Sequence, residues 1–387
     1  MKKFFKNYFK ESFVIVLVSA FTLGMCIWGI RVQSGYQHYN NESITYVKGM
    51  ITEISNEELT KDPGNAKRYV GRQKVKAKVL EGTYKGETVE IDNYLTSASN
   101  VYVEPGMKVI LSQDQPENTA PYFLVYNYYR SPIIYGMVGM FVLLMILIGG
   151  KKGIRATLGL AFTLLTIVML MLPMISSGIS PVLASIVTVV ITTAVTLLLL
   201  NGFSKKTLTA VLGTALGTMI VGVLFGMVSY FLHISGYNTD EAEFMVLISS
   251  NTELKVAEVL FAGVLISSLG AVMDVGMSIA SAIWEILEVN PALTAKQLFF
   301  SGLNVGKDMI GTMSNTLILA FTGSGLSTLL VLTAYGIRYH QFLSSDFLAI
   351  EVGQGLSGTM AVILTVPITS AVSAYVYKRK NLFHKTS

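Results

Sequence analysis

The stretch "GAVMDVGMSIASAIWE" (residues 270–285) decides the fold class, because it closes an apolar run that extends from Val256 to Ile283. A helix of that length spans about 42 Å at 1.5 Å per residue. The hydrocarbon core of a bilayer is only about 30 Å thick. No Lys or Arg occurs between Lys255 and Lys296, yet Asp274 lies inside the run. The stretch therefore predicts a membrane helix that carries an acidic side chain.

The same apolar pattern recurs along the chain of 387 residues, of which 52% are hydrophobic and only 14% are charged. In an average soluble protein about a quarter of the residues are charged. Together with 256–283, the apolar runs are 12–30, 133–148, 156–175, 181–200, 208–232, 309–335 and 355–377. The sequence thus predicts an α-helical integral membrane protein with about eight transmembrane helices in the lipid bilayer.

Residues 33–130 differ from these runs, because they are polar, charged and rich in Val, Ile, Thr and Tyr. Turn signals such as "KDPGN" (61–65) divide the region into short segments. Five of these predict strands: "SITYVKGMITEIS" (43–55), "QKVKAKVL" (73–80), "ETVEIDN" (87–93), "MKVILSQD" (107–114) and "PYFLVYNYY" (121–129). We expect a small β-domain, an OB-like barrel or a sandwich. It has no His cluster and no Ser-His-Asp arrangement, so we expect it to bind or gate rather than to catalyse.

Three domains follow from this order. Residues 1–32 form an uncleaved signal-anchor helix, residues 33–130 the β-domain, and residues 131–387 a seven-helix transmembrane domain. The single Cys26 excludes an intrachain disulfide. The tetrapeptide "LGMC" (23–26) loosely resembles a lipoprotein cleavage site, but we favour a plain buried cysteine, because the apolar run continues past it.

Basic residues gather at the ends of the apolar runs, which indicates topology rather than nucleic-acid binding. If the N-terminus is inside, the short cytoplasmic segments hold Lys2, Lys3, Lys6, Lys10, Lys151, Lys152, Arg155, Lys205, Lys206, Lys296, Lys307, Lys378, Arg379, Lys380 and Lys385. The outer side then receives Arg338, Lys255 and the acidic loop 233–253. We predict that both termini are cytoplasmic and that the β-domain is extracytoplasmic.

A polar stripe starts at Asp274. Ser278, Ser281 and Glu285 follow it at i+4, i+7 and i+11, which is one face of a helix. Apolar residues point elsewhere on the same helix: Leu269, Val272, Val275 and Ile279.

The next span repeats this pattern in "GLNVGKDMIGTMSNTL" (302–317), where Asp308, Thr312 and Asn315 lie at i, i+4 and i+7. The two helices are antiparallel, so Asp274 and Asn315 are expected at similar depth, within reach of a shared hydrogen bond. We predict a path for an ion or a substrate between the sixth and seventh spans, lined by Asp274, Ser278, Ser281, Asp308, Thr312 and Asn315.

Asp274 has two interpretations. A charge at the bilayer centre costs about 2.5–3.5 kcal/mol on insertion scales, so such a residue faces the bundle interior or water and is a functional candidate. The alternative is a structural polar pair between helices, with a Ser or an Asn as partner. Nothing in the sequence indicates a cofactor, a metal site or catalytic residues.

We also predict gating residues at the ends of this path. Lys307 and Asp308 lie at the expected cytoplasmic mouth, with Glu285 at the end of the preceding span. At the other end "TGSG" (322–325) interrupts the seventh span, so Gly323 and Gly325 are candidates, because interrupted membrane helices line cavities. In the fifth span four glycines at small-residue spacing predict a helix-packing face: Gly213, Gly217, Gly222 and Gly226.

Residues 270–325 and the segment "VLEGTYKGETVEIDN" (79–93) resemble the YibE/F-like family of bacterial multi-spanning membrane proteins. The resemblance covers most of the chain. It implies a permease-like role in the bacterial cell membrane, in some members beside a second, related membrane protein. It does not imply a substrate. Asp274, Asp308 and Asn315 lie in the most similar part.

Three classes of function remain open. We favour a transporter or permease linked to a cation or a proton, acting on an unidentified small solute or ion, alone or as a homo-oligomer. A non-transporting sensor or assembly factor, whose outer β-domain binds a ligand or partner, is the alternative. An intramembrane aspartyl protease built on Asp274 and Asp308 is disfavoured, because Lys307 would keep Asp308 ionised, whereas paired catalytic carboxylates share a proton. We therefore do not expect an enzyme.

Overall fold

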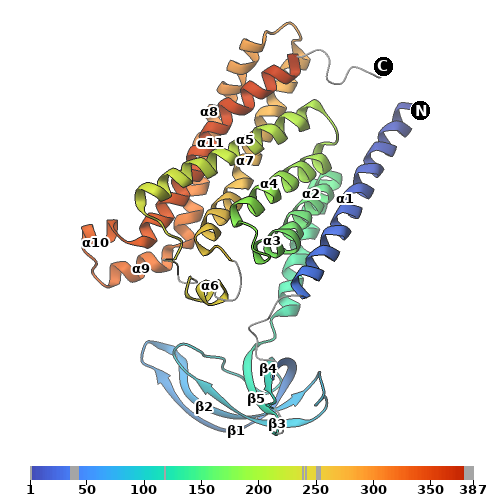
Figure 1. Cartoon of the computed structure of the whole chain (residues 1–387). Coiled ribbons are helices and arrows are strands. Elements are labelled where there is room, and N and C mark those ends of the chain that lie inside the picture. The colour runs from blue at the N-terminus through green and yellow to red at the C-terminus, as the bar shows by residue number, and fades with distance from the viewer. Residues whose placement is uncertain are drawn as a thin grey trace. The chain divides into compact units, whose positions relative to one another are not determined.

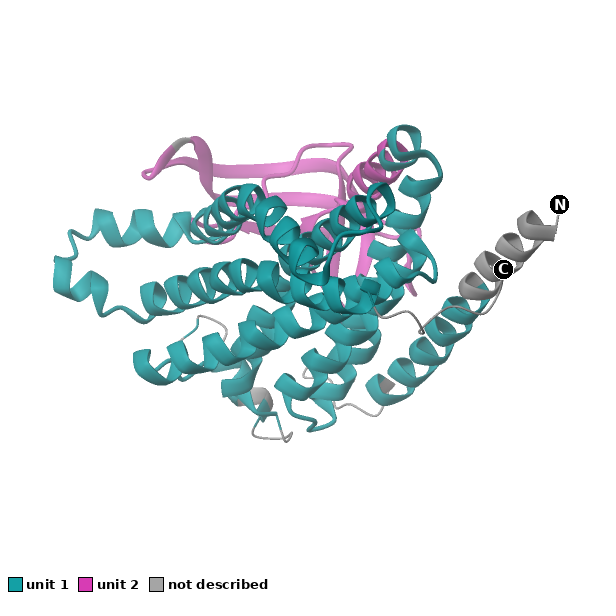
Figure 2. Ribbon diagram, turned by 90° about the horizontal axis from the view of Figure 1, so that it is seen from above, with its two compact units in different colours: residues 1–36, 145–387 teal, residues 37–144 magenta. Residues whose placement is uncertain are grey.

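The computed structural model describes residues 2–34, 43–116, 119–237, 239, 242–249 and 254–378. Contacts divide the chain into two compact units, residues 1–36 with 145–387 and residues 37–144 (Figure 2). The second unit contains the expected β-domain together with the beginning of the helix that follows it. It therefore extends past residue 130, where we expected the domain to end. Asp240, Glu241 and Glu253 of the predicted acidic loop lie outside the described residues.

Unit 2 (residues 37–144) is built on one antiparallel sheet of five strands in the order β3-β2-β1-β4-β5 (Figure 1). Their bounds are β1 (Ile44–Asp62), β2 (Asn65–Val79), β3 (Thr88–Leu95), β4 (Lys108–Asp114) and β5 (Tyr122–Tyr128). The outer strands β3 and β5 also contact each other, so the sheet curls into a half-barrel. All five predicted strands are confirmed, and so is the turn after Asp62, which joins β1 to β2.

The concave side of the half-barrel holds its own hydrophobic core, which includes Ile51, Val75 and Leu111, all with no exposed surface. One buried polar residue ties the sheet to the loop after β3. The Gln73 amide nitrogen donates to the Val103 carbonyl at 3.0 Å, and the Gln73 carbonyl oxygen accepts from the Val103 N–H at 3.2 Å. The unit therefore has what a domain needs in order to fold alone.

Unit 1 (residues 1–36 and 145–387) is helical (Figure 1). Its long helices are α1 (Lys2–Ser34), α4 (Pro181–Asn201), α5 (Lys205–Leu232), α7 (Val256–Val289), α8 (Ala295–Ser324) and α11 (Asp346–Lys378). The helix α2 (Ser131–Thr166) continues through a π-helical turn (Ile167–Met171) into α3 (Leu172–Ser176). Shorter helices are α6 (Ala242–Ser249), α9 (Leu326–Ala334) and α10 (Tyr339–Leu343).

Within the described residues, six helical segments are long and apolar enough to cross a membrane, or up to seven if α8 and α9 count as one bent span. We expected about eight. The difference lies in Ser131–Ser176, which counts as one run of 46 residues but is broken at Gly150, between the two spans that we expected at 133–148 and 156–175. The backbone at Gly150 is not helical, with φ 55° and ψ −134°. A side chain at Gly153 would collide with the Met145 carbonyl, so the chain bends sharply at this point.

Helix α11 is the centre of the helical unit and packs against α5, α7 and α8. Glycines make these contacts close. At Gly217 of α5 an added Cβ would lie 2.7 Å from Val272 of α7 and closer still to Thr365 of α11. The other glycines of the predicted packing face lie against the same two helices, Gly213 against Thr369, and Gly222 and Gly226 against Phe261. The prediction that α5 packs through its glycines is confirmed.

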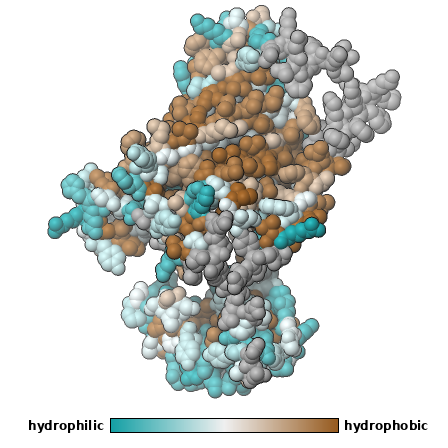
Figure 3. Space-filling model, in the orientation of Figure 1, coloured by the Kyte–Doolittle hydropathy of each residue, from teal (hydrophilic) through white to brown (hydrophobic). Residues whose placement is uncertain are grey.

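Apolar side chains cover much of the outside of the helical unit, as Figure 3 shows for one face. Many of them are largely exposed, among them Leu147, Val223 and Leu330. Monomeric soluble proteins rarely expose apolar surface on this scale, whereas a bilayer covers it. The chain is a multi-pass membrane protein.

Candidate functional site

The predicted stripe on α7 lies on the outer face of this helix. Asp274 and Ser278 are exposed, and Ser281 is half-buried. The opposite face is packed, with Val272, Val275 and Ile279 fully buried, as the helical periodicity predicts. Asp274 forms no hydrogen bond or ion pair with any residue that the structure describes. The alternative interpretation, in which Asp274 pairs with a Ser or an Asn of another helix, therefore has no partner residue in the described part of the chain.

The stripe on α8 also faces outward, since Asp308, Thr312 and Asn315 are all exposed. The hydroxyl group of Thr312 donates to the Met309 carbonyl of its own helix at 3.1 Å. Among the described residues, no hydrogen bond joins Asp274 to Asn315. The shared hydrogen bond therefore stays a prediction.

The predicted cytoplasmic gate is arranged differently from our expectation. Helix α8 begins at Ala295, so Lys307 and Asp308 lie well inside a helix rather than at its end. The Lys307 ammonium group donates to Asn304 at 3.4 Å, and the described contacts include no ion pair with Asp308. Glu285 lies 3.7 Å from Lys206 of α5, with most of its side chain exposed. These residues are not brought together as one gate.

The interruption near "TGSG" is real and has a definite geometry. Helix α8 ends at Ser324, α9 begins at Leu326, and the two are bent by 56°. Gly325 caps both helices and is buried, whereas Gly323 is exposed with open space where a Cβ would lie. A Cβ at Gly325 would lie 2.8 Å from the ring of Phe347 and 3.4 Å from Oε1 of Glu351. Only Gly325 of the two glycines therefore lies at a constrained position.

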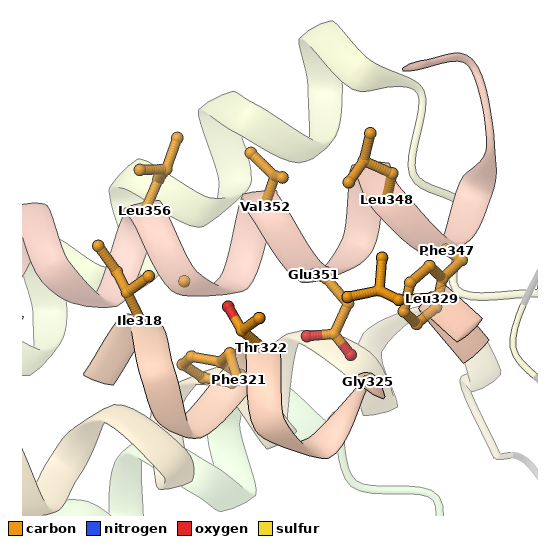
Figure 4. A pocket seen from close by; sticks show the side chains of 11 residues that line it. Ile318, Phe321, Thr322, Gly325, Leu329, Phe347, Leu348, Glu351, Val352 and Leu356 are labelled. Atoms are coloured by element: carbon orange, nitrogen blue, oxygen red, sulfur yellow. The ribbon is translucent and has the colours of Figure 1, made fainter. Parts of the chain in front are cut away.

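A cavity of about 260 Å³ lies at this bend, between α8, α9 and α11 (Figure 4). Ten of its eleven lining residues are uncharged and most are apolar. The exception is Glu351, whose carboxylate lies between Thr322 and the bend at Gly325 (Figure 4). The Oε2 atom of Glu351 is buried and has no hydrogen-bond partner among the residues that the structure describes. An unpartnered carboxylate oxygen in an apolar cavity is an unusual and costly arrangement.

Two helix ends of opposite partial charge meet beside the Glu351 carboxylate. The N-terminal end of α9 favours a carboxylate by about 0.3–1 kcal/mol, and the C-terminal end of α8 disfavours it by a similar amount. Gly325 caps both helices, so these two effects largely cancel. Broken helices in transporters use the same combination of helix ends and polar side chains to hold charged groups.

Sequence reasoning missed Glu351. It is the last residue of "RYHQFLSSDFLAIE" (338–351), which lies between the expected apolar runs 309–335 and 355–377 and which we therefore expected to be part of an outer loop. In the structure α11 already begins at Asp346, so Glu351 lies on a helix. Its position one turn before an apolar run, next to the glycines of "VGQGLSG" (352–358), was the available signal.

The polar face of α8 leads to this cavity. Asp308, Thr312, Asn315 and Thr322 lie at i, i+4, i+7 and i+14, which places them on one side of the helix. The distance along the axis from Asp308 to Thr322 is roughly 21 Å, a large part of the bilayer thickness. Thr322 lines the cavity that contains Glu351. The predicted stripe and the newly found acid thus lie along one helix face.

The described part of the chain contains no group of three or more His, Cys, Asp or Glu side chains that could hold a metal ion. The arrangement offers single carboxylates on a helix face and beside a helix break. It is suited to binding and releasing a positive charge.

Two family models match the chain. The model described as YibE/F-like protein matches residues 137–379, and the model described as YibE/F family N-terminal domain matches residues 40–124. The first alone covers more than half of the chain. The chain belongs to the YibE/F-like family. No curated protein and no solved structure matches it significantly. The two matched regions correspond to the half-barrel and to the helical part of this YibE/F-like protein.

Proposed function

We propose that this YibE/F-like protein is a membrane permease whose transport is linked to a proton or another cation. One observation carries the proposal: the polar face of α8 ends at a broken helix, where the Glu351 carboxylate lies in an apolar cavity. Membrane proteins keep such costly carboxylates mainly where they bind or relay charge.

The path runs along α8 from Asp308 to Glu351, with the stripe of α7 as a second polar wall. Asp274, Ser278 and Ser281 contribute to this wall. Both stripes face outward in a single chain, and a bare charge against lipid is costly. A second copy of the chain, or a related family member, therefore covers them in the proposed assembly.

In this proposal the protein lies in the bacterial cell membrane with both termini in the cytoplasm, as the basic residues predict. The half-barrel is then extracytoplasmic. Asp308 lies towards the cytoplasmic side and Glu351 towards the outer side. Because the positions that bind charge are single carboxylates, one positive charge moves at each step.

The test is potential-driven proton uptake into proteoliposomes that enclose a pH-sensitive dye. Vesicles with the wild-type protein should acidify faster than empty vesicles, and Glu351→Gln should abolish the difference. Asp346→Asn is the matched control, because Asp346 lies on the same helix but does not line the cavity. Wild-type uptake no faster than that of empty vesicles would exclude proton coupling. Uptake that survives in Glu351→Gln would remove the Glu351 cavity from the path.

The alternative is a sensor or assembly factor that binds a ligand through the half-barrel. One observation favours it. Tyr46 and Tyr126 stack edge to face at 4.7 Å on the outside of the sheet, and Tyr122 on the same strand as Tyr126 is also exposed. Exposed aromatic clusters are typical of binding surfaces. If the stable, well-folded protein shows no flux, the sensor or assembly function would replace the permease function.

A further inference from the structure

We propose that the cavity at the α8–α9 bend binds a small organic cation with an apolar body, and that the Glu351 carboxylate pairs with its positive charge. The inference rests on the proposed permease function and names the class of ligand that this site accepts.

The lining of the cavity argues against an inorganic cation as its main ligand. Ca²⁺ takes six to eight oxygen ligands, and Mg²⁺ requires near-octahedral coordination. The side chains around this cavity offer one carboxylate, from Glu351, and one hydroxyl group, from Thr322. A metal ion would therefore remain largely uncoordinated by side chains. A single carboxylate is sufficient for a monovalent organic cation, whose remaining surface needs apolar contacts.

The apolar part of the lining fits the body of such a ligand. Phe321 and Phe347 lie on different helices of the lining, and aromatic rings are common partners of organic cations. Most ligand pockets combine an apolar wall with a few placed polar groups. The volume of about 260 Å³ is just below the range of about 300–1,000 Å³ that holds drug-sized molecules, so the ligand is small.

The cavity is also open to the outside of the helical unit. Ile318, Val352 and Leu356 line it and are each about 40–50% exposed on the outside of the helical unit. These residues lie beside the polar face of α8, which water reaches in the proposed permease. A ligand can therefore enter along this face, place its apolar part against these side chains and reach Glu351 with its charge.

The experiment is isothermal titration calorimetry on the purified full-length protein in detergent, with benzyltrimethylammonium as the probe. This quaternary cation carries no dissociable proton, and its single ring suits the cavity. Binding should weaken at least tenfold in Glu351→Gln and remain unchanged in Asp346→Asn. Benzyl alcohol, which has the same ring without the charge, should bind at least tenfold more weakly than the cation.

Equal binding to the wild type and to Glu351→Gln would overturn the inference, as would equal affinity for benzyl alcohol. Both results would mean that the cavity accepts apolar groups in general, such as detergent or lipid tails. No binding of the probe to a protein that still takes up protons would overturn this inference and leave the permease function standing. Binding without any flux would support the cation site and contradict the permease.

Discussion

Replacement of Glu351 by glutamine should stabilise the protein against heat, although it removes the charge that the proposed function needs. Glutamine has nearly the same shape, so the packing of the cavity is preserved. What changes is the charge of a group whose Oε2 atom is buried and finds no partner in the described part of the chain. A higher midpoint in Glu351→Gln would mean that the carboxylate destabilises the fold, and a lower midpoint would mean that it stabilises the fold.

The magnitude follows from the depth of Glu351 in the membrane. A charge at the centre of a membrane helix costs about 2.5–3.5 kcal/mol. Glu351 lies eleven residues from Val362 in the middle of α11, or roughly 16 Å along the axis, which is near the edge of a hydrocarbon core about 30 Å thick. The cost near the interface is at most about 1 kcal/mol, and the opposite partial charges of the two helix ends at Gly325 largely cancel. The loss of the charge should thus raise the free energy of unfolding by up to about 1 kcal/mol, or the unfolding midpoint by up to roughly 2 °C.

The assay is thermal unfolding of the detergent-purified protein at pH 8, followed by circular dichroism. Asp346→Asn is the control, because Asp346 is exposed in the first turn of the same helix and should not raise the midpoint. A midpoint more than about 2 °C below that of the wild type in Glu351→Gln would refute the reasoning. It would show that the carboxylate holds a structural partner that a charge-neutral side chain cannot replace.

Three further changes test other parts of the account. Asp274→Asn should abolish proton uptake, while size-exclusion chromatography still shows an assembled protein. Normal uptake in this variant would mean that Asp274 has only a structural role. Gly217→Leu should lower the unfolding free energy by about 3 kcal/mol through overpacking against α7 and α11, while Gly263→Leu, which meets open space, should cost little in the same thermal assay. Gln73→Leu should destabilise the isolated half-barrel in urea by about 3 kcal/mol, because it leaves buried backbone groups of the loop unpaired. Gln113→Leu, which among the described residues removes one 3.5 Å hydrogen bond, should have a much smaller effect, and similar losses in both variants would contradict the role of Gln73.

The fold could largely be predicted from the sequence, because its two signals are strong and local. Apolar runs longer than a bilayer is thick predict membrane helices, and alternating residues between turn signals predict strands. The number of spans was harder to predict. A glycine pair such as Gly149 and Gly150 separates two apolar runs whether the chain bends or continues, and only the backbone angles of Gly150 show the bend.

The candidate site was predictable only in part. Periodicity places Asp308, Thr312 and Asn315 on one helix face, and the structure agrees. Which way that face points depends on the packing of α8 against α11, and this packing is set by Gly302 and Gly306 rather than by the polar residues themselves. Glu351 escaped notice because a single acid near a loop carries no periodic signal. Its significance comes from the bend at Gly325, on another helix.

Water should reach the polar face of α8 from Asp308 to the Glu351 cavity if this face carries charge across the membrane. Cysteine labelling tests it most directly, because Cys26 is the only native cysteine. In a Cys26→Ser background reconstituted into liposomes, Thr312→Cys, Asn315→Cys and Thr322→Cys should react with a charged, water-soluble thiol reagent. Val190→Cys, which is 40% exposed on the outside of α4, should not react, since lipid covers it. Failure of all three α8 positions to react, with a cysteine at the exposed Lys296 labelled normally, would contradict the account.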